Sequence, residues 1–220
     1  MKFTSFLIVF LFVINFSHAQ ELKIKYDIIM KSSDPAMQTQ LQMSEGSTLT
    51  LYAKGDKSRV EMKMGELMTT TTIIDLTKKR GLTLMDGMLG KQGATFEGED
   101  FEKFSSTDSD AEIELVDETK TILGYKCKKA IAYLEDDGGE MVFWYTEDID
   151  VADAFLGEYS KFGLPGVALE YGVEQAEITM KFVASKFETS IKDDKGLFDL
   201  KIPAGYTEKS FKDMMNMSGQ

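Results

Sequence analysis

Few side chains in this 220-residue sequence combine in a way that supports catalysis. The single histidine, His18, lies in an N-terminal apolar segment, so the rest of the chain cannot form a Ser-His-Asp or Cys-His pair or a histidine-based metal site. Paired carboxylates remain, and Asp136/Asp137 and Glu97/Asp100 are the nominal pairs. Both lie in acidic, turn-like stretches, where nothing raises the pKa of one carboxyl group above the other. We therefore expect no catalytic residues and no enzyme.

No motif predicts a cofactor or a metal site. Asp108–Glu112 (DSDAE) resembles part of a calcium loop, but the glycine and the distal glutamate of an EF-hand are absent. Gly138 and Gly139 follow two aspartates, whose charge repels a phosphate group. Cys127 is the single cysteine, so no internal disulfide forms, and its pattern favours a buried strand residue over a reactive thiol.

The first 19 residues have the pattern of a secretory signal peptide. Lys2 gives a short basic start, Phe6–Ile14 is an unbroken apolar run, and Ser17-His18-Ala19 is a small-x-small cleavage box. The apolar run is too short to span a bilayer. We expect cleavage after Ala19 and an exported protein, periplasmic or extracellular, that is soluble and has no stable membrane anchor.

The charge balance disfavours two classes of partner. Loss of residues 1–19 removes Lys2 and changes the formal net charge from −12 to −13. Binding to nucleic acid depends on neutralising phosphates, and binding to anionic membrane surfaces depends on basic residues. We therefore expect no nucleic-acid partner.

The clearest structural signal is the stretch Tyr125–Ile149. A strand-like run from Tyr125 to Tyr133 is followed by the hairpin-type turn DDGG at 136–139 and by a second run, Met141–Tyr145. The second run has β-branched and aromatic residues on both faces, so both faces must be covered. A helix, the far wall of a barrel or a ligand could cover the second face.

The remaining apolar patterns predict an antiparallel meander with few helices. The expected strands are Leu22–Met30, Met37–Ala53, Arg59–Met64, Met68–Leu76, Leu82–Met85, Ile113–Glu118, Val167–Tyr171, Ala176–Phe187 and Phe198–Ile202. Helices are expected over Val151–Tyr159 and Tyr206–Met217. In the glycine-rich, acidic stretch Asp86–Asp110, the motif EDFEKF leaves a short helix and a solvated loop as alternatives.

Four segments carry a family resemblance: Thr121–Ala130 (TILGYKCKKA), Val142–Ile149 (VFWYTEDI), Phe162–Tyr171 (FGLPGVALEY) and Phe198–Tyr206 (FDLKIPAGY). With the export signal, they resemble a secreted GLPG-element family of unknown function, related to the LolA/LolB-like periplasmic lipoprotein carriers. The resemblance implies a mostly β (α+β) fold, namely an incomplete antiparallel β-barrel with covering helices. Residues 20–220 would then form a single LolA-like half-barrel domain whose concave apolar face accepts acyl chains.

These observations predict an exported carrier that binds a lipid, an acyl chain or another apolar small molecule in the cell envelope. The abundant methionines as a set fit a binding surface of variable shape, although for any one of them core packing is the more frequent explanation. The expected ligand-binding residues are Phe143, Trp144, Tyr145, Phe155, Leu164 and Met180. The alternative is an envelope protein-interaction module that holds a protein partner through a sheet edge or the methionine-rich C-terminal helix.

Overall fold

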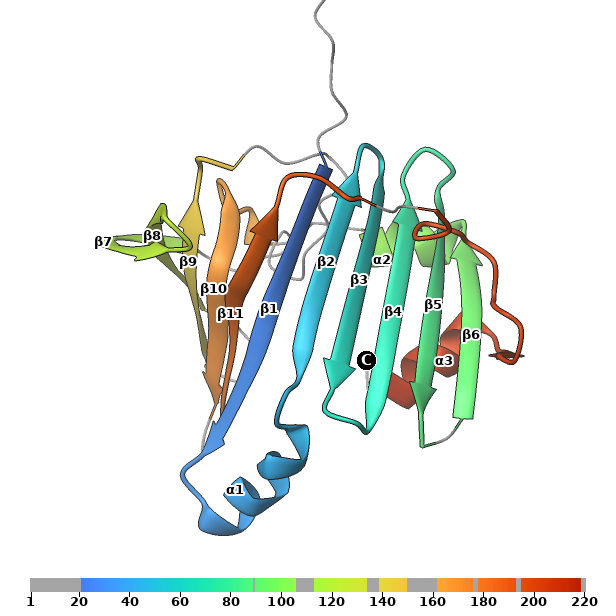
Figure 1. Cartoon of the computed structure of the whole chain (residues 1–220), viewed down its shortest axis with the longest axis horizontal. Helices are drawn as coiled ribbons and strands as arrows, with labels where there is room; N and C mark the ends of the chain where they lie inside the picture. Colours follow the sequence, from blue (N-terminus) through green and yellow to red (C-terminus); the bar gives the residue numbers. More distant parts are fainter. Residues whose placement is uncertain are drawn as a thin grey trace, which may run out of the picture.

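One large sheet contains every strand of the part of the chain that the structure describes. The computed structural model describes residues 21–88, 90–105, 113–133, 139–149, 162–175, 178–192 and 195–218. The sheet has 12 strands in the order β12-β6-β5-β4-β3-β2-β1-β11-β10-β9-β8-β7 and is antiparallel except for β12 (Figure 1). The predicted class, mostly β with few helices, is therefore confirmed.

The elements follow the chain with short connections between most of them. The strands are β1 (Glu21–Ser32), β2 (Thr48–Lys54), β3 (Lys57–Met64), β4 (Met68–Asp75), β5 (Arg80–Gly87), β6 (Gly90–Glu97), β7 (Ile113–Ile122), β8 (Tyr125–Tyr133), β9 (Glu140–Thr146), β10 (Val167–Gln175), β11 (Ile178–Glu188) and β12 (Thr207–Glu208). The helices are α1 (Pro35–Leu41), the 3-10 helix η1 (Gln42–Ser44), α2 (Glu99–Ser105) and α3 (Phe211–Ser218).

The sheet consists of two antiparallel meanders, which meet where β1 pairs with β11. β1 to β6 pair in chain order on one side, and β7 to β11 pair in chain order on the other. β11 closes the arrangement because it pairs with β1, with Tyr26 opposite Ala184, while the other edge of β1 pairs with β2, with Tyr26 opposite Leu49. Strand pairing thus places the first strand of the described chain beside β11, in the middle of the sheet.

The side of the sheet formed by β1, β2 and β8–β11, here called the aromatic half, has a core of large side chains. Tyr26 and Phe143 have no exposed surface, and Tyr171 is 2% exposed. The Tyr26 hydroxyl donates a hydrogen bond to the carbonyl oxygen of Ala168 at 2.8 Å, which satisfies its buried polar atom. Its ring packs edge-on against Tyr171, and Tyr171 stacks on Phe182 with ring centroids 4.6 Å apart.

The other side, formed by β4–β6 and here called the wrapped half, is covered on both faces. Ile73 and Ile74 follow one another on β4 and therefore point to opposite faces. Ile73 packs in a cluster with Phe198, Leu200 and other side chains of residues 195–206, here called the C-terminal strap. Ile74 packs in a cluster with Phe96 and with side chains of α2 and α3.

The C-terminal strap continues around the edge of the sheet. After the strap, Thr207 and Glu208 pair with β6 as the parallel strand β12, and α3 then packs on the opposite face through Phe211 and Met214. Figure 1 shows this red segment passing in front of β4 and β5 before α3 appears behind them. A terminal segment that covers the edge strand also removes a site for unwanted strand pairing.

Several predicted elements are present where the sequence indicated them. The hairpin of β8 and β9 is confirmed, with Ala132 opposite Met141. The motif EDFEKF forms helix α2, and buried Phe101 explains why the helix prevails over a solvated loop. The predicted C-terminal helix is present in shorter form as α3, and the predicted helix Val151–Tyr159 lies outside the described residues.

Three expectations were wrong in detail. Part of the predicted strand Met37–Ala53 forms α1 and η1, and only its end forms β2. Phe198–Ile202 alternates like a strand because one side of it packs on the sheet, but it forms no strand. The stretch Asp86–Asp110 was not expected to contain β6, whose Gly93 leaves room for Ile202 of the strap.

Candidate functional site

The two central residues of the predicted ligand site belong to the core. Phe143 and Tyr145 of β9 are 0% and 2% exposed. The Phe143 ring lies 5.4 Å from that of Phe162 and 6.3 Å from that of Tyr171. Phe162 opens the segment FGLPG, and Gly166 in that segment approaches the Thr146 carbonyl so closely that a Cβ atom has no room. This part of the GLPG element therefore serves packing between β9 and β10.

Trp144 points to the opposite face of β9 and is covered by lysines. The Nζ atom of Lys120 lies 4.2 Å from the ring centroid, and that of Lys129 lies 5.9 Å from it. Lys120 also forms an ion pair of 2.6 Å with Glu170, and Lys129 forms one of 2.9 Å with Glu118. We call these five residues the tryptophan clamp, because they tie β7, β8, β9 and β10 together across one face.

The other predicted site residues do not form an open site with Trp144. Leu164 and Met180 are half-buried and pack against the core of the aromatic half. Phe155 lies outside the described residues. The prediction that these six residues bind a ligand together thus receives no support from the positions of the five that are described.

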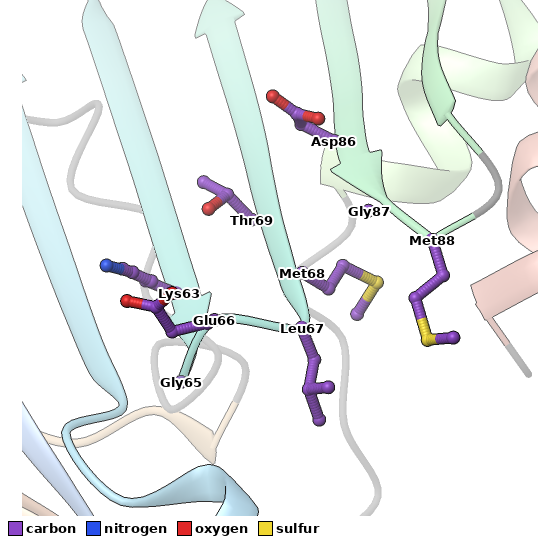
Figure 2. Close-up of a pocket in the computed structure, with 9 residues that line it drawn as sticks. All are labelled: Lys63, Gly65, Glu66, Leu67, Met68, Thr69, Asp86, Gly87 and Met88. Atoms are coloured by element: carbon purple, nitrogen blue, oxygen red, sulfur yellow. The ribbon is translucent and has the colours of Figure 1, made fainter.

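An open depression of about 400 Å³ lies instead at one end of the wrapped half (Figure 2). Residues 63 and 65–69, around the turn between β3 and β4, form one wall. Residues 86–88, where β5 turns toward β6, form the other. Two adjacent hairpin ends therefore build this depression, and we call it the hairpin-tip depression.

A row of polar side chains crosses the sheet at this end. In the register of the sheet, Lys63 of β3 lies opposite Thr69 of β4, and Thr69 lies opposite Asp86 of β5. Directly paired residues point to the same face, so an ammonium group, a hydroxyl group and a carboxylate stand side by side. Asp86 is also opposite Lys91 of β6 and forms an ion pair of 2.6 Å with it, which extends the row.

Apolar side chains form the rim of the same depression. Met88 is 90% exposed and Leu67 is 38% exposed, and both belong to the turns that close the hairpins. Figure 2 shows the two side chains extending past the strand ends in the same direction, away from Asp86. The depression therefore offers hydrogen-bonding groups on the sheet and apolar surface beside them.

A buried serine positions the turn of the first wall. Ser47 is 1% exposed, and its Oγ accepts a hydrogen bond of 2.9 Å from the Gly65 backbone N–H. The Ser47 hydroxyl in turn donates to the carbonyl oxygen of Ser44 in η1. The turn is closed by a hydrogen bond of 3.0 Å from the Leu67 backbone N–H to the Met64 carbonyl oxygen. Segment α1–η1 therefore fixes the turn that presents Glu66 and Leu67.

The titrating groups with shifted pKa values do not make an acid–base pair. Burial alone raises the pKa of Asp75, but hydrogen bonds from the backbone N–H and the ammonium group of Lys78 outweigh it and hold that pKa below its ordinary value. A hydrogen bond from Lys186 lowers the pKa of Glu188. A catalytic acid needs a raised pKa, and neither carboxylate lines the depression.

The other reactive candidates from the sequence lie apart from one another or outside the described residues. Cys127 is buried, as expected, and its burial raises the pKa of the thiol, which disfavours the nucleophilic thiolate. Glu97 forms an exposed ion pair with Arg80, and Asp100 lies in the first turn of α2. Asp136, Asp137 and Asp108–Glu112 lie outside the described residues. Within the described ranges, no group of three or more His, Cys, Asp or Glu side chains is placed to hold a metal ion.

No helix among the described residues is long and apolar enough to cross a membrane.

Comparison with known proteins gives a family model and a fold. Residues 94–164 match the model of the N-terminal domain of N-glycanase peptide, which covers about a third of the chain. Two solved structures of PNGF-II, in space groups P21 and C2, are similar to the whole fold. Their TM-scores are 0.52 and 0.51, and their sequences are 18% and 16% identical over 90% and 92% of this chain. The chain spans about a third of the length of PNGF-II, 33% in each case. None of the curated proteins matches the sequence.

These findings correct the expected relationship. The matched family model is that of an N-glycanase domain and the similar solved structures are those of PNGF-II, and nothing in these matches indicates a LolA/LolB-like carrier. The resemblance through the GLPG element, the lipid-carrier function and the apolar partner were therefore wrong. The alternative, an interaction module acting through a sheet edge or the C-terminal helix, gains no support from them either.

Sequence reasoning also missed the hairpin-tip depression. Its residues lie on three strands and two turns, and they come together only through the register of β3, β4 and β5. One signal was available, namely the leucine in the turn sequence MGELM, where a polar residue is usual.

Proposed function

We propose that this chain is an exported, non-catalytic domain of the N-glycanase N-terminal type, and that it binds N-glycosylated proteins. The observation that carries the proposal is the family match over residues 94–164, which runs from β6 through β9. The likeness to PNGF-II supports the same fold type for the rest of the sheet.

The ionisable side chains of the chain favour a binding role over a catalytic one. Residues 20–220 contain no histidine, and the described carboxylates with shifted pKa values are held in the charged form rather than the protonated one. Hydrolysis of a glycan linkage by carboxylates requires one of them to remain protonated near neutral pH. Binding of a glycosylated substrate requires no such group. We therefore assign to this domain the holding of a glycoprotein, and not the cleavage of its glycan.

Export is consistent with this assignment. The basic start, the apolar run Phe6–Ile14 and the cleavage box at Ser17–Ala19 support secretion across a membrane, which would place the domain where it can meet proteins outside the cytoplasm.

The test compares how the chain binds a glycoprotein and the same protein without its glycan. The full chain is immobilised and exposed by biolayer interferometry to a glycoprotein with a single oligomannose N-glycan and to the same protein made without the glycan. The proposal expects binding of the glycosylated form and at least tenfold weaker binding of the other. Equal binding of both forms contradicts it, as does release of glycan during prolonged incubation of the glycoprotein with the chain.

A further inference from the structure

We infer that the hairpin-tip depression is the site that contacts the sugar residues, and that its ligand is a neutral hexose unit of the N-glycan. This inference rests on the proposed function and gives it a location. It follows from the mixture of groups that line the depression, since one side is polar and ordered by the sheet and the other is apolar and exposed.

The polar row matches the hydroxyl groups of a sugar. Lys63 offers donors, Asp86 offers acceptors, and the Thr69 hydroxyl can do both. The strands hold these three side chains on neighbouring positions of one face, so their spacing follows the strand separation of about 4.8 Å. Because strand pairing fixes the backbone of these positions, binding of adjacent hydroxyl groups orders side chains only and does not also order a loop backbone.

The apolar rim matches the other side of the same ligand. A pyranose ring carries hydroxyl groups at its edge and C–H groups on its faces, so it needs both kinds of surface. Met88, at 90% exposed, contributes flexible apolar surface that no intramolecular contact uses to any extent. Leu67 extends beside it from the neighbouring turn (Figure 2).

Size and openness agree with an oligosaccharide. The volume of about 400 Å³ falls within the range of roughly 300–1,000 Å³ that is typical of small-molecule sites. The depression is open rather than enclosed, so a glycan can pass through it while still attached to its protein. The carboxylates of Glu66 and Asp86 disfavour an anionic ligand, and the polar row disfavours an acyl chain.

The tryptophan clamp is the competing site, and its geometry is less suitable. Aromatic side chains often stack on sugars, but the face of Trp144 is already covered by Lys120 at 4.2 Å. Lys120 is held there by its ion pair with Glu170, and both side chains are less than one-third exposed. A sugar would have to displace Lys120 before it could stack on Trp144. In the hairpin-tip depression, Asp86 pairs with Lys91 through Oδ2, and its second carboxylate oxygen can accept from a sugar hydroxyl while that pair stays in place.

The experiment measures the affinity of the full chain for a released oligomannose N-glycan by titration calorimetry. Asp86→Asn removes the negative charge of the acceptor while keeping its shape. Glu66→Gln removes a second carboxylate, and Met88→Ser removes the more exposed of the two rim side chains. We expect about tenfold weaker binding for Asp86→Asn, since a hydrogen bond to a charged group is lost, and about threefold weaker binding for Met88→Ser.

Each variant has a matched control on another element. Glu102→Gln removes the carboxylate of the exposed Glu102–Lys79 ion pair on α2, which resembles the Asp86–Lys91 pair in exposure. Leu115→Ser removes an exposed apolar side chain from β7, at the other edge of the sheet. Both controls should bind the glycan as the unmodified chain does. Circular dichroism checks that every variant keeps the fold.

The possible failures are distinguishable. If the unmodified chain binds the glycoprotein but the three depression variants bind the glycan unchanged, the inferred site is wrong and the proposed function stands. If Lys120→Met weakens binding and Asp86→Asn does not, the sugar binds at the tryptophan clamp and the inference is overturned. If the chain binds neither the glycoprotein nor the glycan, the proposed function fails and the inference fails with it.

Discussion

The aromatic half and the wrapped half of this sheet are stabilised by different parts of the chain. In the aromatic half, rings from neighbouring strands fill the core, and the Tyr26 hydroxyl satisfies its hydrogen bond within it. In the wrapped half, the C-terminal strap packs on one face of the strands, and α2 and α3 pack on the other. The open depression lies at the end of the wrapped half, where cover ends and turn residues remain exposed.

This difference in how the two halves are covered indicates where a single-sheet fold can leave surface for a ligand. A strand whose own side chains fill the core leaves little surface for a ligand, as Phe143 and Tyr145 show. A strand covered by a separate segment can instead leave its end uncovered, as the exposed side chain of Met88 shows. The four predictions below test this contrast, beginning with the largest expected effect.

Replacement of Phe211 by alanine should weaken the wrapped half most. Its ring stacks on Phe96 with centroids 4.3 Å apart and also meets Phe104, so α3 loses its main anchor. We expect a loss of about 3 kcal/mol in the free energy of unfolding, measured in urea. Hydrogen exchange should accelerate in β5 and β6 before β1 and β10. Uniform acceleration across all four strands would show that the halves are one cooperative unit.

Gly93→Ala should cause the next largest loss in the free energy of unfolding, because Gly93 lies where the strap packs on the sheet. A Cβ atom at Gly93 meets Leu84 Cδ2 at 2.8 Å and Ile202 Cγ2 at 3.2 Å, so the end of the Leu84 side chain must move and Ile202 of the strap must give way by a few tenths of an ångström. Overpacking of this kind costs roughly 1–3 kcal/mol, and we expect about 2 kcal/mol by thermal or urea unfolding. Thr95→Ala, on the same strand and face, serves as the control. An unchanged midpoint for Gly93→Ala would mean that the strap is loosely attached.

Asp75 should make the wrapped half sensitive to acid. Its folded-state pKa lies below the unfolded value of about 3.9, so its stabilisation is present above that pH and is lost as the pH falls through the folded pKa. Asp75→Asn removes the titrating group, and we expect a loss of about 1 kcal/mol at pH 7. The difference between the two proteins should shrink as the unfolding free energy is measured at successively lower pH. A constant difference down to pH 2 would exclude this role.

Lys120→Met, which changes the tryptophan clamp on the aromatic half, should cause the smallest loss in the free energy of unfolding. The ion pair with Glu170 is partly exposed, and pairs of this kind contribute about 0–1 kcal/mol, to which the contact with Trp144 adds a little. Trp144 is the single tryptophan, so its fluorescence reports on the clamp alone. We expect a shifted emission maximum with less than about 1 kcal/mol lost. A loss as large as that of Phe211→Ala would reverse the contrast between the two halves.

Much of the fold could be predicted from sequence because its signals are local. Alternation and turn residues indicate strands, and the run around Trp144 predicted the hairpin of β8 and β9. β6 escaped prediction because Gly93 and its neighbours carry few apolar side chains, and the reason for the glycine is a contact with Ile202, far along the chain. The strap looked like a strand because contact with a sheet imposes the same alternation as pairing does.

The candidate site could not be predicted because none of its signals is local. Lys63, Thr69 and Asp86 are unremarkable polar residues until the register of three strands places them in a row. The aromatic run around Trp144 attracted attention instead, yet its residues serve the core and the clamp. An apolar stretch of sequence indicates burial, and burial by the protein itself is the usual outcome.

The most direct test of sugar binding at the hairpin-tip depression is a methyl NMR titration of the full chain labelled at methionine. An oligomannose N-glycopeptide is added in one series and the same peptide without its glycan in the other. We predict that the methyl resonance of Met88 shifts with the glycopeptide only, while that of Met180, which packs against the core of the aromatic half, stays in place. Absence of a shift at Met88, or equal shifts with both peptides, would contradict the account.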